Sequence, residues 1–140
     1  MLDTDVLVAA LRSDAGASRQ ILLAALAGRF ELLLSVPLIL EYEAVLTRPE
    51  HLAASETTSR DVSDLLDGLA AVAKPVTLAF RWRPELSDPN EDMVLETTIN
   101  GQAHAIVTFN ERDFKAVAAA FGCRVMRPGE FLRAILKVAN

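Results

Sequence analysis

The feature that most constrains the fold is the regular alternation of short apolar runs with longer helical stretches along the whole chain. Runs typical of buried strands cover residues 1–3, 30–35, 76–80, 104–108 and 123–126. Helical spacing is found over residues 6–12, 18–27, 37–47, 58–73, 91–100, 112–121 and 129–138. Strands separated by helices pair in parallel through right-handed crossovers. The sequence therefore predicts an α/β fold, a three-layer α/β/α sandwich around a parallel sheet.

Length and composition restrict the protein further. The chain has 140 residues, 51% of them apolar, which predicts a single domain over residues 1–140 with a packed core. The single cysteine, Cys123, and the two histidines exclude a disulfide framework and a Cys/His zinc site, which favours the reducing cytoplasm. The longest apolar stretches fall short of the ~20 residues of a membrane helix. The net charge of −5 argues against nucleic-acid binding through the overall field.

Acidic residues recur where strands are expected to end. Asp3 ends the first strand and Asp5 follows in Leu2-Asp3-Thr4-Asp5. In parallel sheets, function gathers beyond the carboxyl ends of the strands, where strand order reverses. The structural alternative is that Asp3 or Asp5 only caps the helix that follows.

A second acid is expected on the helix over residues 37–47. Glu41 has only apolar neighbours one turn away, so we expect it to face the interior, where a carboxylate needs a partner. Glu43 is placed almost as well, and periodicity does not choose between them. A solvated glutamate on an amphipathic helix remains the alternative.

The third and fourth acidic groups follow the later strands. From residue 84 to residue 111 the chain has six acids and no Lys or Arg. Asp88 and Glu91 would also form a capping box, and Asn110 would cap the next helix with Asp113 near its third position. If strands one and four are neighbours, Asp3, Glu91 and Asp113 meet in one crevice, with Glu41 reaching in.

Such a group of carboxylates would repel strongly and would take up protons or a cation. Oxygen ligands favour Mg²⁺ or Mn²⁺, and a cation held in this way suits phosphodiester hydrolysis without histidine. Cys123 and His104 are expected to be core residues. Residues 112–140 contain six basic and two acidic residues. This basic segment forms either a rim that faces the phosphates of a substrate or an ordinary solvated face. The candidates in it for binding substrate are Arg112, Arg124 and Arg127.

Four motifs together resemble the PIN-domain family, and in particular the toxin ribonucleases of the virulence-associated protein C type. The four motifs are residues 2–7, residues 35–46 around Glu41, residues 88–96 and residues 106–114. The resemblance implies a five-stranded parallel sheet in the order 3-2-1-4-5, a homodimer, a small cognate antitoxin, and Mg²⁺- or Mn²⁺-dependent cleavage of single-stranded RNA. It assigns the catalytic acids to Asp3, Glu41, Glu91 and Asp113, with Asp3, Glu91 and Asp113 as metal ligands, and supporting roles to Thr4, Asp5, Asp88, Asp92, Thr108 and Asn110.

Three positions depart from the family pattern: Asp5 stands where Asn or Ser is common, Glu91 where Asp is usual, and Asn110 where many relatives have Asp. Two alternatives therefore stay open. One is a catalytically degenerate PIN domain that acts by binding protein or RNA. The other is a haloacid-dehalogenase-like phosphatase, because Asp3-Thr4-Asp5 resembles the paired aspartates of that family.

Overall fold

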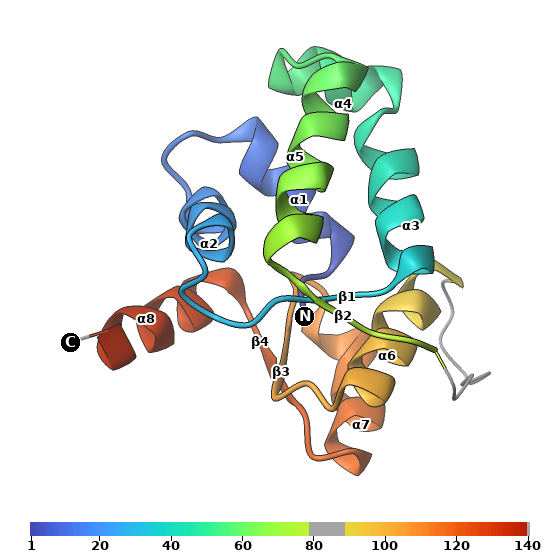
Figure 1. The fold of residues 1–140 in the computed structure, drawn as a ribbon. Coiled ribbons are helices and arrows are strands. Elements are labelled where there is room, and N and C mark those ends of the chain that lie inside the picture. The colour runs from blue at the N-terminus through green and yellow to red at the C-terminus, as the bar shows by residue number, and fades with distance from the viewer. Residues whose placement is uncertain (79–88, 140) are drawn as a thin grey trace.

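The computed structural model describes residues 1–78 and 89–139, and the side chains of residues 1–78, 93–115 and 119–137. Helices and short strands follow one another as the sequence predicts (Figure 1). The elements are α1 (Thr4–Arg12), α2 (Ala17–Leu26), β1 (Leu33–Leu34), α3 (Val36–Leu46), α4 (Pro49–Ser55), α5 (Ser59–Val72), β2 (Lys74–Pro75), α6 (Pro89–Gly101), β3 (Ala105–Val107), α7 (Glu111–Ala120), β4 (Arg124–Met126) and α8 (Pro128–Ala139).

The strands pair in parallel, as expected of an α/β fold. β1 pairs with β2, β3 pairs with β4, and Leu2 forms a parallel bridge with Val107 of β3. In the predicted order 3-2-1-4-5, strand 1 is the segment at Leu2 and strands 2 to 5 correspond to β1, β2, β3 and β4. All of the observed pairs are neighbours in that order. The predicted order also requires a ladder between the first strand and β1, which is not found among the pairings of the described residues. The strands form two parallel groups, and the protein is richer in helix than the prediction of a five-stranded sheet implies.

The third strand begins earlier than the sequence predicts. We expected residues 76–80, whereas β2 consists of Lys74 and Pro75, and residues 79 and 80 lie outside the described part of the chain. The amides of Lys74 and Val76 donate to Leu32 O and Leu34 O, both at 2.8 Å. Pro75 lies between these donors, where an N–H would point away from β1, so its missing donor costs no ladder bond.

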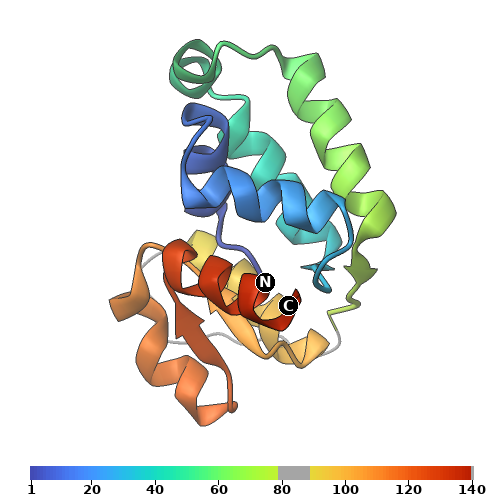
Figure 2. The same ribbon diagram turned by 90° about the vertical axis from the view of Figure 1, so that its left-hand side faces the viewer.

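The helices lie around the strands in two groups. In Figure 2, α1 to α5 lie above the strands, and α6, α7 and α8 lie beside β3 and β4. α2 packs against α1 and α8, whereas α3 packs against both α1 and α6. The buried core runs through both groups and includes Leu2, Leu7, Leu38, Ile106 and Phe114. Cys123 is buried as expected, whereas His104 is exposed, so the prediction of His104 as a core residue was wrong. None of the described helices is both long and apolar enough to span a membrane.

Two hydroxyl contacts fasten α3 in place. The Tyr42 hydroxyl is fully buried and donates to the carbonyl oxygen of Leu2. The Ser35 Oγ caps α3 and lies 2.7 Å from Thr97 Oγ1 of α6. Because the Thr97 hydroxyl donates to Met93 O, Ser35 supplies the proton of the contact between the two hydroxyls. The first strand, α3 and α6 are thereby held together at the edge where the first strand ends.

Candidate active site

Asp3 occupies the carboxyl end of the first strand and the start of α1 at the same time. Its amide donates to Val107 O at 2.9 Å, which fixes the backbone beside β3. Its side chain caps α1 by accepting from the Thr4 amide at 2.8 Å. The residue is 6% exposed. The capping role considered for Asp3 is therefore real, and it holds the carboxylate in a fixed, buried position.

Thr108 binds this carboxylate from the neighbouring strand. It follows β3, is fully buried, and donates its hydroxyl proton to Asp3 Oδ2 at 2.7 Å. Thr108 Oγ1 in turn accepts from the Asn110 amide at 2.9 Å, and the Thr108 amide donates to Met126 O at 3.0 Å. The turn after β3 is therefore tied to both β4 and Asp3, and it delivers a donor to the acid.

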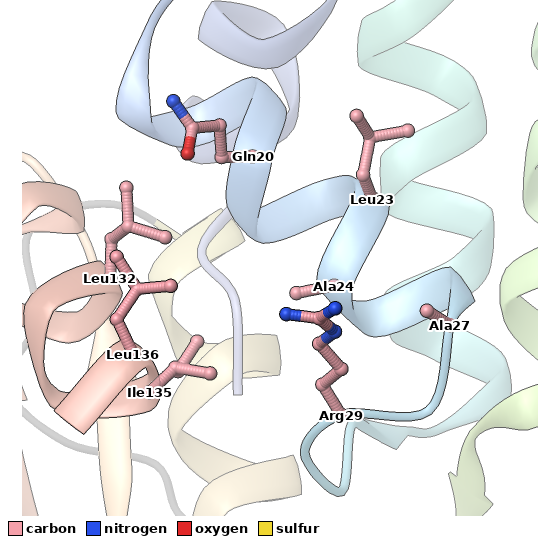
Figure 3. A pocket seen from close by; sticks show the side chains of 8 residues that line it. All are labelled: Gln20, Leu23, Ala24, Ala27, Arg29, Leu132, Ile135 and Leu136. Carbon is pink, nitrogen blue, oxygen red and sulfur yellow. The ribbon is translucent and has the colours of Figure 1, made fainter. Parts of the chain in front are cut away.

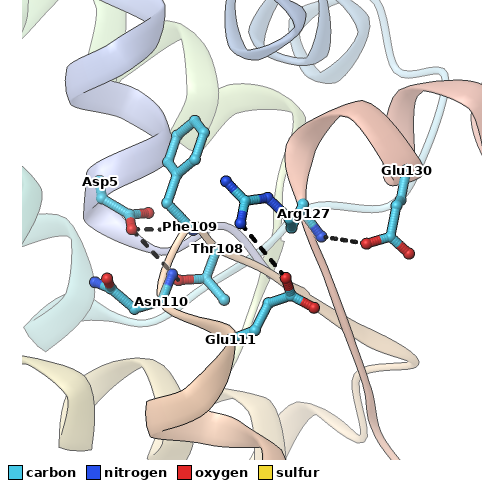
Figure 4. A network of polar contacts seen from close by, with 7 residues as sticks. All are labelled: Asp5, Thr108, Phe109, Asn110, Glu111, Arg127 and Glu130. Carbon is cyan, nitrogen blue, oxygen red and sulfur yellow. Dashed lines mark hydrogen bonds and ion pairs between the residues drawn. The ribbon is translucent and has the colours of Figure 1, made fainter.

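Asp5 is the second carboxylate of the site, on the first turn of α1 (Figure 4). Its Oδ2 accepts from the Phe109 amide at 3.1 Å and lies 3.4 Å from Thr108 Oγ1. Burial, followed by the negative charge of Asp3, raises the pKa of Asp5 from 3.8 to about 7, although the Phe109 and Thr108 donors favour the charged form. We call Asp3 and Asp5 the acid pair.

Two buried oxygens of this site, Thr4 Oγ1 and Asp5 Oδ1, have no hydrogen-bond partner among the described residues. An unpartnered buried oxygen is unfavourable unless another group satisfies it. Hard divalent cations prefer oxygen ligands, and a cation would also relieve the repulsion within the acid pair. The donor set of Asp3, Thr4 and Asp5 therefore fits Mg²⁺ or Mn²⁺.

The other predicted acids are placed less closely. Glu41 lies half-buried in α3 and Glu43 is exposed, so the helix turns Glu41 further inward. Asp113, on the first turn of α7, is exposed. Among the described side chains no group of three or more His, Cys, Asp or Glu could hold a metal, so Asp3, Glu41 and Asp113 do not form one by themselves. The side chain of Glu91 lies outside the described residues, as do the side chain of Asp92 and all of Asp88.

Of the three predicted basic residues, Arg127 lies near the acid pair, and Arg112 and Arg124 lie exposed on other elements. Arg127, after β4, lies 3.7 Å from Glu111 Oε1 through its Nη1, and its Cζ lies 6.0 Å from the centre of the Phe109 ring (Figure 4). Its amide donates to Glu130 Oε1 at 3.4 Å. Arg127 is thus adjacent to the turn that binds the acid pair, whereas Arg112 and Arg124 are exposed on α7 and β4.

Tyr42 was not anticipated from the sequence, although it contributes to this site. Burial raises the pKa of its hydroxyl well above 10, and the charges of Asp3 and Asp5 raise it further. The phenol therefore stays protonated and keeps its bond to Leu2 O, one residue before Asp3. A signal existed, because Tyr42 shares a helical face with Leu38, Val45 and Leu46 and its hydroxyl needs a partner when buried.

Comparison with known proteins gives the family. A family model described as PIN domain matches residues 1–112. The chain belongs to the PIN domain family. PIN domains are generally nucleases, and they typically use divalent metals. Searches of curated proteins and of solved structures found no similar protein. Membership removes the haloacid-dehalogenase alternative, and the matched region contains Asp3, Asp5, Glu41 and the turn at Thr108 of this PIN domain.

Proposed function

We propose that this PIN domain is a metal-dependent endoribonuclease that hydrolyses phosphodiester bonds of single-stranded RNA with Mg²⁺ or Mn²⁺. The observation that carries the proposal is the acid pair at the carboxyl end of the first strand, with Asp3 buried and Asp5 half-buried, together with the unpartnered oxygens Thr4 Oγ1 and Asp5 Oδ1. Membership of a family that is generally nucleolytic supports the same reaction class.

Asp3, Thr4 and Asp5 would hold the cation, and Glu91 and Asp113 would complete the ligand set that the family resemblance assigns. A bound divalent cation would activate water and neutralise phosphate charge. The chain itself positions the ligands: Thr108 orients Asp3 through its hydroxyl, and the Phe109 amide orients Asp5. Both donors come from the single turn after β3, which limits movement of the two carboxylates. Glu41 would face the same crevice from α3 as the fourth acid.

The deciding experiment compares the wild-type protein with Asp3→Asn on single-stranded RNA in the presence of Mn²⁺. Asparagine retains a cap for α1 but removes the charge, so cleavage should be lost while the circular dichroism spectrum is unchanged. Asp64→Asn, an exposed change on α5, is the matched control and should cleave normally. Cleavage by Asp3→Asn at the wild-type rate, with preparations purified in parallel, would refute the assignment.

A catalytically degenerate PIN domain remains the second candidate. The observation that favours it is that the described side chains contain no group of three or more His, Cys, Asp or Glu residues that could hold a metal. This candidate predicts that wild-type protein binds RNA or a protein partner yet leaves RNA uncut at millimolar Mn²⁺. Metal-dependent cleavage by the wild-type protein, lost in Asp3→Asn, would exclude it.

The proposed biological setting is a cytoplasmic toxin that acts as a homodimer and is neutralised by a small cognate antitoxin protein. Large apolar side chains are exposed on two helices: Leu23 (57%) on α2, where it lines a pocket together with Leu132 and Leu136 of α8 (Figure 3), and Val36 (70%) and Leu40 (59%) one turn apart on α3. Exposed apolar side chains of this kind suit a contact with another protein. Light scattering at tens of micromolar should give twice the mass of the 15.2 kDa chain. A monomer at that concentration would remove the dimer.

A further inference from the structure

Phe109 combines a fixed backbone with an exposed ring. Its amide donates to Asp5 Oδ2 at 3.1 Å, and it directly follows the fully buried Thr108. Its side chain is nevertheless 39% exposed. Figure 4 shows the ring pointing away from the Asp5 carboxylate and toward the side of Arg127. The main chain of one residue thus binds the acid pair while its aromatic ring lies on the surface beside it.

Arg127 supplies a cation next to this ring. Its Cζ lies 6.0 Å from the ring centre, at the limit of a cation–π contact. Its only ion pair within the described residues is the 3.7 Å contact with Glu111, which is longer than a charge-assisted hydrogen bond. The Arg127 side chain is 55% exposed, and a guanidinium has five N–H donors. Several of its donors are therefore open to a further acceptor.

An exposed aromatic ring beside a guanidinium is the pair of groups with which proteins bind single-stranded nucleic acid. A base stacks on the ring in a manner that tolerates any sequence, and an arginine binds the adjoining phosphate. Bases of a duplex are stacked on each other and do not offer a free face to a protein ring. The arrangement therefore favours single-stranded RNA over a duplex.

We propose that Phe109 and Arg127 form a one-nucleotide subsite, in which a base of single-stranded RNA stacks on Phe109 and its phosphate binds Arg127. This inference rests on the proposed function and adds to it the group that positions the RNA chain. Because the Phe109 amide is bonded to Asp5, the stacked nucleotide lies next to the acid pair. Phe109 is a positioning residue, since it fixes where the chain lies and takes no part in bond cleavage.

The test measures RNA binding in an Asp3→Asn background, so that cleavage does not interfere. Fluorescence anisotropy with a labelled single-stranded RNA in Mg²⁺ should show binding at least fivefold weaker for Phe109→Ala. Phe109→Tyr should bind within twofold of the parent, because it keeps the aromatic face. Phe109→Leu keeps the apolar volume without that face and should resemble the alanine variant. Circular dichroism reports whether each variant is folded.

Phe121 provides the matched control. It is 42% exposed and follows the opposite end of α7 from Glu111, so Phe121→Ala should leave RNA binding within twofold of the parent. An RNA with one abasic position should bind the parent more weakly than intact RNA. The same abasic RNA should lose nothing further on Phe109→Ala, because the stacking partner is already missing.

The outcomes separate this inference from the proposed function. Equal binding by Phe109→Ala and the parent, equal loss in Phe121→Ala, or additive effects of Phe109→Ala and the abasic position would each overturn the subsite. Failure of the parent to bind single-stranded RNA would overturn it as well. The proposed function depends instead on cleavage by the wild-type protein and its loss in Asp3→Asn, which is a separate measurement.

Discussion

Replacement of Asp5 by asparagine should stabilise the metal-free protein, and the gain should depend on pH. Burial and the charge of Asp3 raise the pKa of Asp5 from 3.8 to about 7, so the folded protein retains a proton that the unfolded chain releases. The ionisation of Asp5 therefore begins to oppose folding above about pH 4, opposes it more up to pH 7, and has its full effect above that. Asparagine has no charge to bury, and its amide oxygen still accepts from the Phe109 amide.

The magnitude follows from the size of the pKa shift. A rise from 3.8 to about 7 corresponds to at most about 4 kcal/mol, at about 1.4 kcal/mol per pH unit. Because Asp5 is only half-buried, solvent screens part of this effect, and we expect Asp5→Asn to gain about 1 to 2 kcal/mol at pH 8. The gain should be smaller at pH 5 and should disappear near pH 4.

Urea unfolding followed by circular dichroism, in EDTA at pH 4, 5 and 8, measures this gain. The exposed Asp64→Asn variant controls for a general loss of negative charge, and its stability should follow the wild-type protein at all three pH values. An Asp5→Asn protein that is no more stable than wild type at pH 8 would refute the reasoning. A gain that is the same at pH 4 and pH 8 would show that the charge of Asp5 is not its cause.

Three further outcomes are expected. Millimolar Mn²⁺ should raise the melting temperature of the wild-type protein and not that of Asp3→Asn, because a ligand bound only by the folded state stabilises it; an equal shift in both would place the metal elsewhere. Tyr42→Phe should lower the free energy of unfolding in urea by about 1 to 3 kcal/mol, since Leu2 O loses its buried donor; an unchanged value would contradict this. Glu41→Gln should lower the RNA cleavage rate more than Glu43→Gln, and the reverse order would show that the wrong face of α3 was chosen.

Every predicted helical stretch is found as a helix because its signals are local, whereas α4 (Pro49–Ser55) was not among the predicted stretches. Pro37 lies at the start of α3, and Gly101 and Gly122 lie at the end of α6 and just after α7, close to where the sequence places these boundaries. The third strand was placed wrongly because Val76 begins a run with the stronger β pattern, whereas pairing with β1 starts at Lys74. Strand pairing depends on distant backbone partners, which a local pattern does not contain.

The candidate site was predicted in its composition and less well in its contacts. Asp3 was identified from its place after a strand, and Asp5 was expected only to support it. The pKa of Asp5 is raised by burial and by the charge of Asp3, and two donors that oppose this rise, the Phe109 amide and the Thr108 hydroxyl, lie more than a hundred residues away in sequence. The contact of Tyr42 with Leu2 O also joins distant parts of the chain, 40 residues apart. Such contacts follow from tertiary packing, so residue spacing alone did not reveal them.

The double use of Asp3 has a consequence for how this domain can change in evolution. Asn and Asp are about equally good helix caps, so Asp3→Asn leaves the start of α1 intact while it removes the charge of the site. The Asp3 amide and its bond to Val107 O do not depend on the side chain. Aspartate and asparagine codons differ at a single base. One point mutation would therefore remove the charge of the site and leave the fold intact. The product would be a folded protein that selection could then adapt to binding alone.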